Sequence, residues 1–287
     1  MKKSYNFEKL TWEEVNKAVE AKKVCLIPAG TIEDHGLHLP IDTDVVIADT
    51  ICKKVANIIP NEIVLLPCLN IGYSPHHIDG PGVLTIRWDT YINYVKDITS
   101  SLAYHGFKKM LIVNGHGSNR PALDLATRLT VVENPDVQCA MVSWWDLKKV
   151  QEEFNSIRES EWTGHACELE TSIYLAADYG NVYMQKAKKD INPYMSKHFF
   201  DDLANNPPKG YANPVHLTEY WSTVSKTGTW GDPTVATKEK GEKIINKAAQ
   251  ELVEIIAELK ERPIRKRVPH QLEDVRLRNK MTGKLNE

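Results

Sequence analysis

The sequence predicts an α/β protein in which helices cover both faces of a mainly parallel sheet. Short apolar runs alternate with longer amphipathic segments through the first two thirds of the chain, and polar turns that contain histidine follow two of these runs. This alternation is typical of βαβ units, whose functional loops lie at the carboxyl ends of the strands. We therefore expect ligand-binding side chains along one edge of the sheet.

The individual elements follow from the spacing of apolar residues. We expect strands over 23–29, 62–68, 110–114 and 137–143, and helices over 45–57, 89–106, 121–133 and 165–176. Asn119, just before Pro121, predicts an N-cap and first turn for the third helix. A last amphipathic helix is expected from Lys238 to about Arg262. Residues 190–235, rich in proline, glycine and aromatics without a clear period, predict a long covering loop.

Length and composition exclude several functional classes. The 287 residues are 42% hydrophobic with a formal net charge of −2, so the chain can form a large core but offers no strong field for nucleic acid or an anionic membrane. No stretch resembles a signal peptide or a membrane span. We expect a cytoplasmic protein that acts on a small molecule.

The chain is expected to form one domain over residues 1–262, followed by an arm over 263–287. Basic residues from Arg262 onward outnumber acidic ones, eight to three, while the whole chain is nearly neutral. An arm that packs on its own or a neighbouring subunit is the favoured interpretation, and a contact with nucleic acid is the alternative.

The five cysteines are odd in number and widely spaced, which favours reduced thiols over a disulfide framework. Cys167 lies beside a histidine and two glutamates, so a cysteine nucleophile is a rival hypothesis. A nucleophile needs a positioned base, and no oxyanion turn is evident around Cys167, so a packing role is favoured.

A cluster of acids and histidines follows the first predicted strand. Glu33 and His35 are two residues apart, so both side chains point to one face of an extended segment, and Asp44 returns to the same place as the next helix begins. His116 follows the third predicted strand and should approach the same edge. For His38 and Asp42 we favour turn and supporting roles.

A glutamate from the helix over 165–176 would complete a set of about five nitrogen and oxygen ligands. Such a carboxylate-rich set suits zinc, manganese or a pair of such ions bridged by an aspartate. The convergence of these groups from separate elements is the reason to favour a metal centre over isolated caps and turns.

The order of the motifs resembles that of the creatininase (creatinine amidohydrolase) family. The similar segments are Glu33–Pro40 with Thr43–Asp44, Asn114–Asn119, Gly164–Ser172 and Gly228–Pro233. The resemblance implies a three-layer α/β/α fold, a binuclear metal hydrolase and assembly into hexamers.

The resemblance also implies roles for individual residues. Glu33, Asp44 and His116 would hold one divalent ion, and His35 and Asp44 the other, with zinc or manganese favoured and iron(II) as an alternative. Creatininase itself has a glutamate ligand where this chain has Ser118. We therefore assign that role to Glu170, with Glu168 as the alternative.

Further residues are expected around the metals. The resemblance implies that His165 moves protons during catalysis, together with Glu170. The expected substrate-contacting residues are Ser74, His76, His77 and Trp162.

The substrate class stays open among three interpretations. The favoured one is hydrolysis of a small cyclic amide by metal-activated water, although Ser118 and Gly117 argue against creatinine itself. The polar loop His76–Asp79 would suit a hydroxylated ring, which supports carbon–carbon bond hydrolysis of a cyclic diketone such as 3-dehydro-scyllo-inosose. A non-catalytic binding module is the third interpretation, and the intact ligand set argues against it.

Overall fold

The structure is a computed structural model and describes residues 5–191, 194–268 and 270. Its strands are β1 (Val24–Ala29), β2 (Ile63–Leu65), β3 (Lys109–Asn114), β4 (Gln138–Ser143), β5 (Thr163–His165) and β6 (Trp230–Gly231). Its α-helices are α1 (Trp12–Glu20), α2 (Thr43–Ile58), α3 (Trp88–Tyr104), α4 (Asn119–Glu133), α5 (Lys148–Ile157), α6 (Glu168–Ala177), α7 (Trp221–Val224) and α8 (Lys238–Glu261).

Within the described residues the main sheet has four parallel strands in the order β2-β1-β3-β4. The central pair, β1 and β3, runs in register, so that Ala29 at the end of β1 lies beside Asn114 at the end of β3. The polar segments that follow these two strands therefore start from the same edge of the sheet. This is the edge on which the sequence predicts the functional groups.

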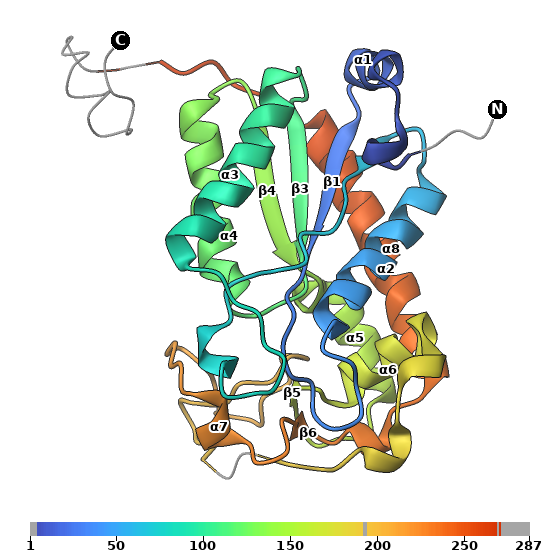
Figure 1. The fold of residues 1–287 in the computed structure, drawn as a ribbon, viewed down its shortest axis with the longest axis vertical. Coiled ribbons are helices and arrows are strands. Elements are labelled where there is room, and N and C mark those ends of the chain that lie inside the picture. The colour runs from blue at the N-terminus through green and yellow to red at the C-terminus, as the bar shows by residue number, and fades with distance from the viewer. Residues whose placement is uncertain (1–4, 192–193, 269, 271–287) are drawn as a thin grey trace.

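Side chains of the central strands alternate between two cores. Val24 and Leu26 of β1 face a core formed with α2, α5, α6 and α8, whereas Cys25 and Ile27 face a second core formed with α1, α3 and α4. Figure 1 shows α3 and α4 on one side of the sheet and α2 and α8 on the other. The three-layer α/β/α prediction is confirmed.

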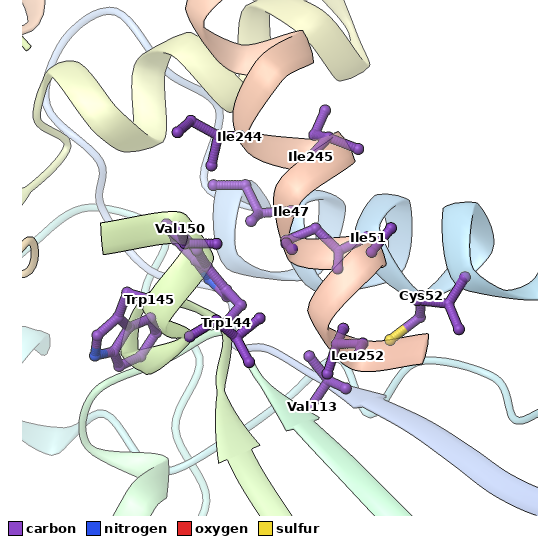
Figure 2. Close-up of a cluster of buried hydrophobic side chains, with 14 of the residues drawn as sticks. Ile47, Ile51, Cys52, Val113, Trp144, Trp145, Val150, Ile244, Ile245 and Leu252 are labelled. Atoms are coloured by element: carbon purple, nitrogen blue, oxygen red, sulfur yellow. The ribbon is translucent and has the colours of Figure 1, made fainter. Parts of the chain in front are cut away.

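The larger core fixes α2 and α8 against the sheet. Figure 2 shows Ile47 and Ile51 of α2 among Val113 of β3, Trp144 after β4 and Leu252 of α8. Each of these side chains is fully buried, and burying one such side chain contributes about 1.5–3 kcal/mol. The packing fixes the position of the first turn of α2, which carries Asp44, next to the carboxyl ends of the strands.

Most predicted elements are present, with two omissions and two corrections. Helices α1 and α5 were not predicted. The helix expected over 165–176 begins only at Glu168, because residues 163–165 form β5 and pair with β6. Asn119 is the first residue of α4 rather than its N-cap, and its buried side chain donates to the Gly30 carbonyl (3.0 Å) and accepts from the Tyr73 amide (2.9 Å). It ties three loops together instead of capping a helix.

The remaining predictions concern the covering loop, the cysteines and the arm. Residues 190–235 contain the short elements α7 and β6, and the five cysteines are free thiols. Among the described residues, no helix combines the length and apolar character needed to cross a membrane. The predicted arm over 263–287 lies outside the described residues except for 263–268 and 270.

Candidate metal centre

Acidic and imidazole side chains from four segments meet at the carboxyl edge of the sheet. Glu33 and His35 follow β1, Asp44 lies in the first turn of α2, and His116 follows β3. Glu170 comes from the first turn of α6. All five side chains are buried, with at most 5% of each residue exposed. The sequence analysis named these residues, and the structure brings them together.

The carboxylates lie between imidazole rings. His116 Nδ1 lies 3.2 Å from Glu33 Oε1 and 3.1 Å from Asp44 Oδ2. The other Asp44 oxygen, Oδ1, lies 3.2 Å from His35 Nε2. Asp44 therefore faces a different imidazole with each oxygen, which is the arrangement expected of a carboxylate that bridges two ions.

Main-chain carbonyls orient three of the imidazoles. His35 Nδ1 donates to the Glu33 carbonyl (3.4 Å), His116 Nε2 to the Tyr73 carbonyl (3.2 Å) and His165 Nε2 to the Asp34 carbonyl (2.6 Å). Because a carbonyl only accepts hydrogen bonds, the bonded nitrogen carries the proton and the second nitrogen of each ring faces the carboxylates. Metal-ligating histidines are typically oriented in this way.

Charge pairing changes the protonation of the metal-free site. Burial lowers the pKa of His35 and His116, but Asp44 and Glu33 raise each of them to about 10. Burial likewise raises the pKa of the Glu33 carboxyl, whereas His116 and His77 bring it well below its ordinary value. These imidazoles are therefore protonated at neutral pH without metal, and a bound cation would take the place of their protons.

Glu170 and Glu168 occupy different environments, although they are two residues apart on α6. Glu170 Oε2 is buried without a hydrogen-bond partner, and burial raises the pKa of this carboxyl to about 7. Glu168 instead accepts hydrogen bonds from Lys240 Nζ (2.6 Å) and from Ser160 Oγ (2.5 Å). Of these two glutamates, Glu170 is the one whose carboxylate groups with the nitrogens of His35 and His165.

Two glycines allow the first turn of α2 to approach the strand ends. A Cβ on Gly30 would lie 2.6 Å from the Val45 nitrogen, and a Cβ on Gly115 would lie 2.6 Å from the Asp44 carbonyl oxygen. Real Cβ atoms do not come this close to backbone atoms. These two positions must lack a side chain for Asp44 to reach His35 and His116.

The residues expected to contact substrate are near the centre, but most of their polar atoms already have partners. Ser74 Oγ donates to Glu33 Oε2 (2.5 Å), and His76 Nε2 lies 3.1 Å from Ser118 Oγ. His77 Nδ1 lies 3.0 Å from Asp34 Oδ1. Asp34 was not singled out in the sequence, although its position between Glu33 and His35 makes it part of the same motif.

Trp162, expected to form an apolar wall near His165, packs on a tryptophan of the covering segment. It packs on Trp230, with 4.4 Å between ring centroids, and its indole nitrogen donates to the Asp201 carbonyl. The tryptophan that contacts His77 and His165 is Trp221 of α7, at centroid distances of 4.6 and 4.8 Å. The sequence analysis missed Trp221 because it lies in the covering segment, outside the motifs.

The donor set fits divalent metal ions. Three sets of three residues each have their ligand atoms within 4.8 Å of one another, and the sets share members. They are Glu33 with His35 and Asp44, Glu33 with His77 and His165, and His35 with His165 and Glu170. Glu170 Oε2 is buried without a partner, and His35 Nε2 and Asp44 Oδ2 are buried without a well-aligned hydrogen bond, although each lies within 3.2 Å of an oppositely charged side chain. Buried imidazole nitrogens and carboxylate oxygens gathered in one place are the ligands that zinc and manganese take.

Comparison with known proteins decides the family. The sequence profile of the creatininase family, described as creatinine amidohydrolase, matches residues 8–256. The chain belongs to the creatininase family. The match confirms the family resemblance that the four motifs predicted, and members of this family are hydrolases.

Relatives in the creatininase family have different activities. The chain is 27% identical over 273 residues to creatinine amidohydrolase from Pseudomonas putida, covering 90% of this chain and 98% of the relative. It is 22% identical over 270 residues to 3-dehydro-scyllo-inosose hydrolase from Thermotoga maritima, covering 89% and 84%. It is 28% identical over 225 residues to a mycofactocin precursor peptide peptidase from Mycolicibacterium smegmatis, covering 76% and 78%.

Solved creatininase structures share the fold over nearly the whole chain. A manganese form of creatininase superposes with a TM-score of 0.74 at 25% sequence identity, covering 90% of this chain and all of the other. A creatininase mutant of Zn-Zn type gives the same TM-score and identity, covering 90% and 99%. Membership of the creatininase family therefore rests on both sequence and fold.

Proposed function

We propose that the protein is a binuclear metal-dependent amidohydrolase that attacks the carbonyl of a small cyclic amide with metal-activated water. The observation that carries this proposal is the arrangement of Asp44, whose two oxygens face His35 and His116 separately, between glutamates on either side. A carboxylate in this position can bridge two cations. Two-metal sites of this class use both cations to hydrolyse an unactivated amide.

The proposed ligands are those that the family resemblance implies, and the contacts of Asp44 with His35 and His116 support them. Glu33, Asp44 and His116 would hold one ion, and His35, Asp44 and Glu170 the other. Zinc and manganese are favoured because creatininase structures of Zn-Zn and manganese type share this fold. Bound there, the ions would lower the pKa of a coordinated water toward neutrality and polarise the substrate carbonyl.

His165 is the proposed proton shuttle. Burial, followed by the charges of His35 and His77, lowers the pKa of His165 to about 3 in the metal-free protein, so the imidazole is neutral at pH 7 and is a weak base until the charges around it change. Its Nε2 is held by the Asp34 carbonyl, which leaves Nδ1, 3.7 Å from Glu33 Oε1, free to accept a proton. We propose that Nδ1 takes the proton of the attacking water and passes it to the leaving nitrogen.

The neighbouring residues keep these groups in place. Ser74 fixes Glu33 through its hydroxyl, and Asp34 orients His77. Both contacts restrict side chains that face the centre, so the ligand atoms need little reorganisation when metal and substrate bind. Ser74, His76, His77 and Trp162 stay the proposed substrate-contacting residues.

Hydrolysis of a carbon–carbon bond in a cyclic diketone is the second candidate. It is supported by the similarity to 3-dehydro-scyllo-inosose hydrolase over 89% of this chain. Against it, the carboxylate of Asp79, in the loop expected to bind a hydroxylated ring, is engaged with Ser222. The cyclic amide is therefore favoured.

Metal content together with a substrate screen tests the proposal. Elemental analysis of the purified protein should find about two zinc or manganese ions per chain, as expected for a two-metal hydrolase. Turnover of a panel of cyclic amides and cyclic diketones should stop on chelation and return when Zn²⁺ or Mn²⁺ is added. Turnover of diketones alone would favour the second candidate. Failure to bind metal after reconstitution would refute the hydrolase and favour a binding module.

Two further expectations accompany this proposal. We propose a homo-oligomer, a hexamer by resemblance, and a cytoplasmic location. Light scattering coupled to size-exclusion chromatography would test the first, and cell fractionation the second.

A further inference from the structure

Trp221 enters the metal centre from an otherwise exposed stretch of the covering segment. Residues 211–220 are all exposed, whereas Trp221 is half-buried. Its ring is stacked on His77, with centroids 4.6 Å apart and an interplanar angle of 19°, and meets His165 edge to face at 4.8 Å and 72°. Since His77 and His165 both face Glu33, Trp221 forms an aromatic wall beside the catalytic groups.

The indole N–H of Trp221 is buried without an acceptor. Among the described residues, three indole nitrogens share this condition, those of Trp144, Trp221 and Trp230. Of these three rings, only that of Trp221 contacts the site histidines. A buried N–H without an acceptor is costly, and such groups are few in folded proteins. A bound molecule with a hydrogen-bond acceptor would satisfy this one.

The position of Trp221 is fixed from both sides. The next residue, Ser222, donates to Asp79 Oδ2 (2.5 Å), which ties α7 to the loop that carries His77. Trp230 packs against Trp221 at 5.3 Å and an angle of 66°. The wall is therefore preorganised, and little side-chain entropy remains to be lost when a ligand binds against it.

We propose that Trp221 is a specificity-determining substrate contact, an inference that rests on the proposed hydrolase function. Its ring packs against a planar cyclic amide, and its Nε1–H donates to an acceptor other than the carbonyl under attack. The favoured substrates are planar five- or six-membered rings that carry a second carbonyl or a ring nitrogen. Puckered, fully hydroxylated rings lack the flat face that the indole packs against.

Chemically matched probes separate the two contributions of the indole. Hydantoin and creatinine are planar and carry a second acceptor, whereas 2-pyrrolidinone has only the carbonyl that would be attacked. Binding of each probe to the zinc-loaded full-length protein is measured by calorimetry for the wild type, Trp221→Phe, Trp221→Ala and Ser222→Ala. Trp12→Phe is the matched control, because Trp12 is 81% exposed on α1.

The expected pattern distinguishes the N–H from the ring. Trp221→Phe should weaken hydantoin or creatinine binding five- to tenfold, the effect of one lost hydrogen bond, and change 2-pyrrolidinone binding less than twofold. Trp221→Ala should weaken all three, and Trp12→Phe none. Ser222→Ala keeps the indole and should cost less than Trp221→Phe.

Three results would overturn the inference. These are unchanged hydantoin and creatinine binding in Trp221→Phe, an equal loss in Ser222→Ala, or no binding of any probe by the zinc-loaded wild type. Metal content and chelator-sensitive turnover of the variants distinguish failure of the Trp221 inference from failure of the proposed hydrolase function. If both persist in Trp221→Phe while its affinities equal those of the wild type, the hydrolase stands and only the role of Trp221 fails.

Discussion

Replacing Glu170 with glutamine is expected to remove metal while making the metal-free protein more stable. The Glu170 carboxyl is buried with one oxygen unpaired, and burial raises its pKa from 4.5 to about 7. Below pH 4.5 the carboxyl is protonated in both the folded and the unfolded protein, so its burial does not lower the free energy of unfolding. As the pH rises to 7 the unfolded chain loses the proton first, and the folded protein is destabilised by up to roughly 3 kcal/mol above pH 7.

The Glu170→Gln variant removes this penalty because glutamine is neutral and of the same shape. At pH 8, with chelator present, the variant should be more stable than the wild type by about 1–3 kcal/mol, which raises the melting temperature by several degrees. At pH 4.5 the gain should disappear. With metal supplied, the same variant should bind fewer ions and lose at least about tenfold in activity, because a carboxylate ligand is missing.

Glu168→Gln is the matched control, two residues away on the same helix. Glu168 is fully buried and accepts from Lys240 Nζ at 2.6 Å and from Ser160 Oγ at 2.5 Å. Removing one partner of a buried ion pair costs about 3–5 kcal/mol. Because Lys240 also contacts Glu159, we expect the lower part of that range, with metal content unchanged.

The assay combines thermal unfolding of chelated protein at pH 4.5 and pH 8 with elemental analysis after reconstitution. The melting temperatures of the two variants should move in opposite directions at pH 8, and only Glu170→Gln should lose metal. Full metal content in Glu170→Gln together with metal loss in Glu168→Gln would refute the ligand assignment. Equal melting temperatures of Glu170→Gln and wild type at pH 8 would refute the argument from burial.

Three other perturbations are expected to give defined results. Gly115→Ala places a Cβ 2.6 Å from the Asp44 carbonyl oxygen and should weaken metal binding at least about tenfold, whereas Gly117→Ala, with no atom within 4 Å, should leave it unchanged by elemental analysis. Cys167→Ala should stay active and chelator-sensitive, since burial raises the pKa of this thiol, and an inactive variant would favour a cysteine nucleophile. Burial lowers the pKa of His38 to about 4, so as the pH falls below 6.5 the unfolded chain takes up a proton that the folded protein does not, and the wild type is destabilised. Between pH 6.5 and 4, His38→Gln should therefore lose up to about 3 kcal/mol less stability than the wild type in thermal unfolding with chelator present. Equal dependence of stability on pH in the two proteins would contradict this.

The main sheet and the helices that cover it were predictable because their signals are local. The apolar runs at β1 and β3 are short, uninterrupted and followed by polar turns, so their type and order follow from periodicity alone. Helix α1 was missed although Thr11 and Glu14 form a capping box, a signal that the printed sequence carries. The start of α6 was misplaced because pairing of β5 with β6, a contact between distant segments, takes the residues before it.

The convergence of the acidic and imidazole side chains was predictable from the strand order, and the orientation of the imidazoles was not. Parallel strands bring their carboxyl ends to one edge, so Glu33, His35 and His116 could be expected together from the strand order. The carbonyls that orient the imidazoles belong to Glu33, Asp34 and Tyr73, and no side-chain pattern marks a main-chain acceptor. Ser74 was expected to meet substrate, yet its hydroxyl bonds Glu33, a choice that depends on the packing of the loop.

The covering segment explains why substrate preference is harder to predict than metal binding. Trp162 is close to His165 in sequence, but its indole donates to the Asp201 carbonyl and its ring packs on Trp230, so the contact with His165 falls to Trp221. The segment that carries Trp221 is held by a few side-chain hydrogen bonds rather than by the core. Substitutions there can reshape the wall without moving the carboxylates. The names of the relatives specify creatinine, an inosose and a precursor peptide, and this variety fits a substrate preference that is set outside the strand ends.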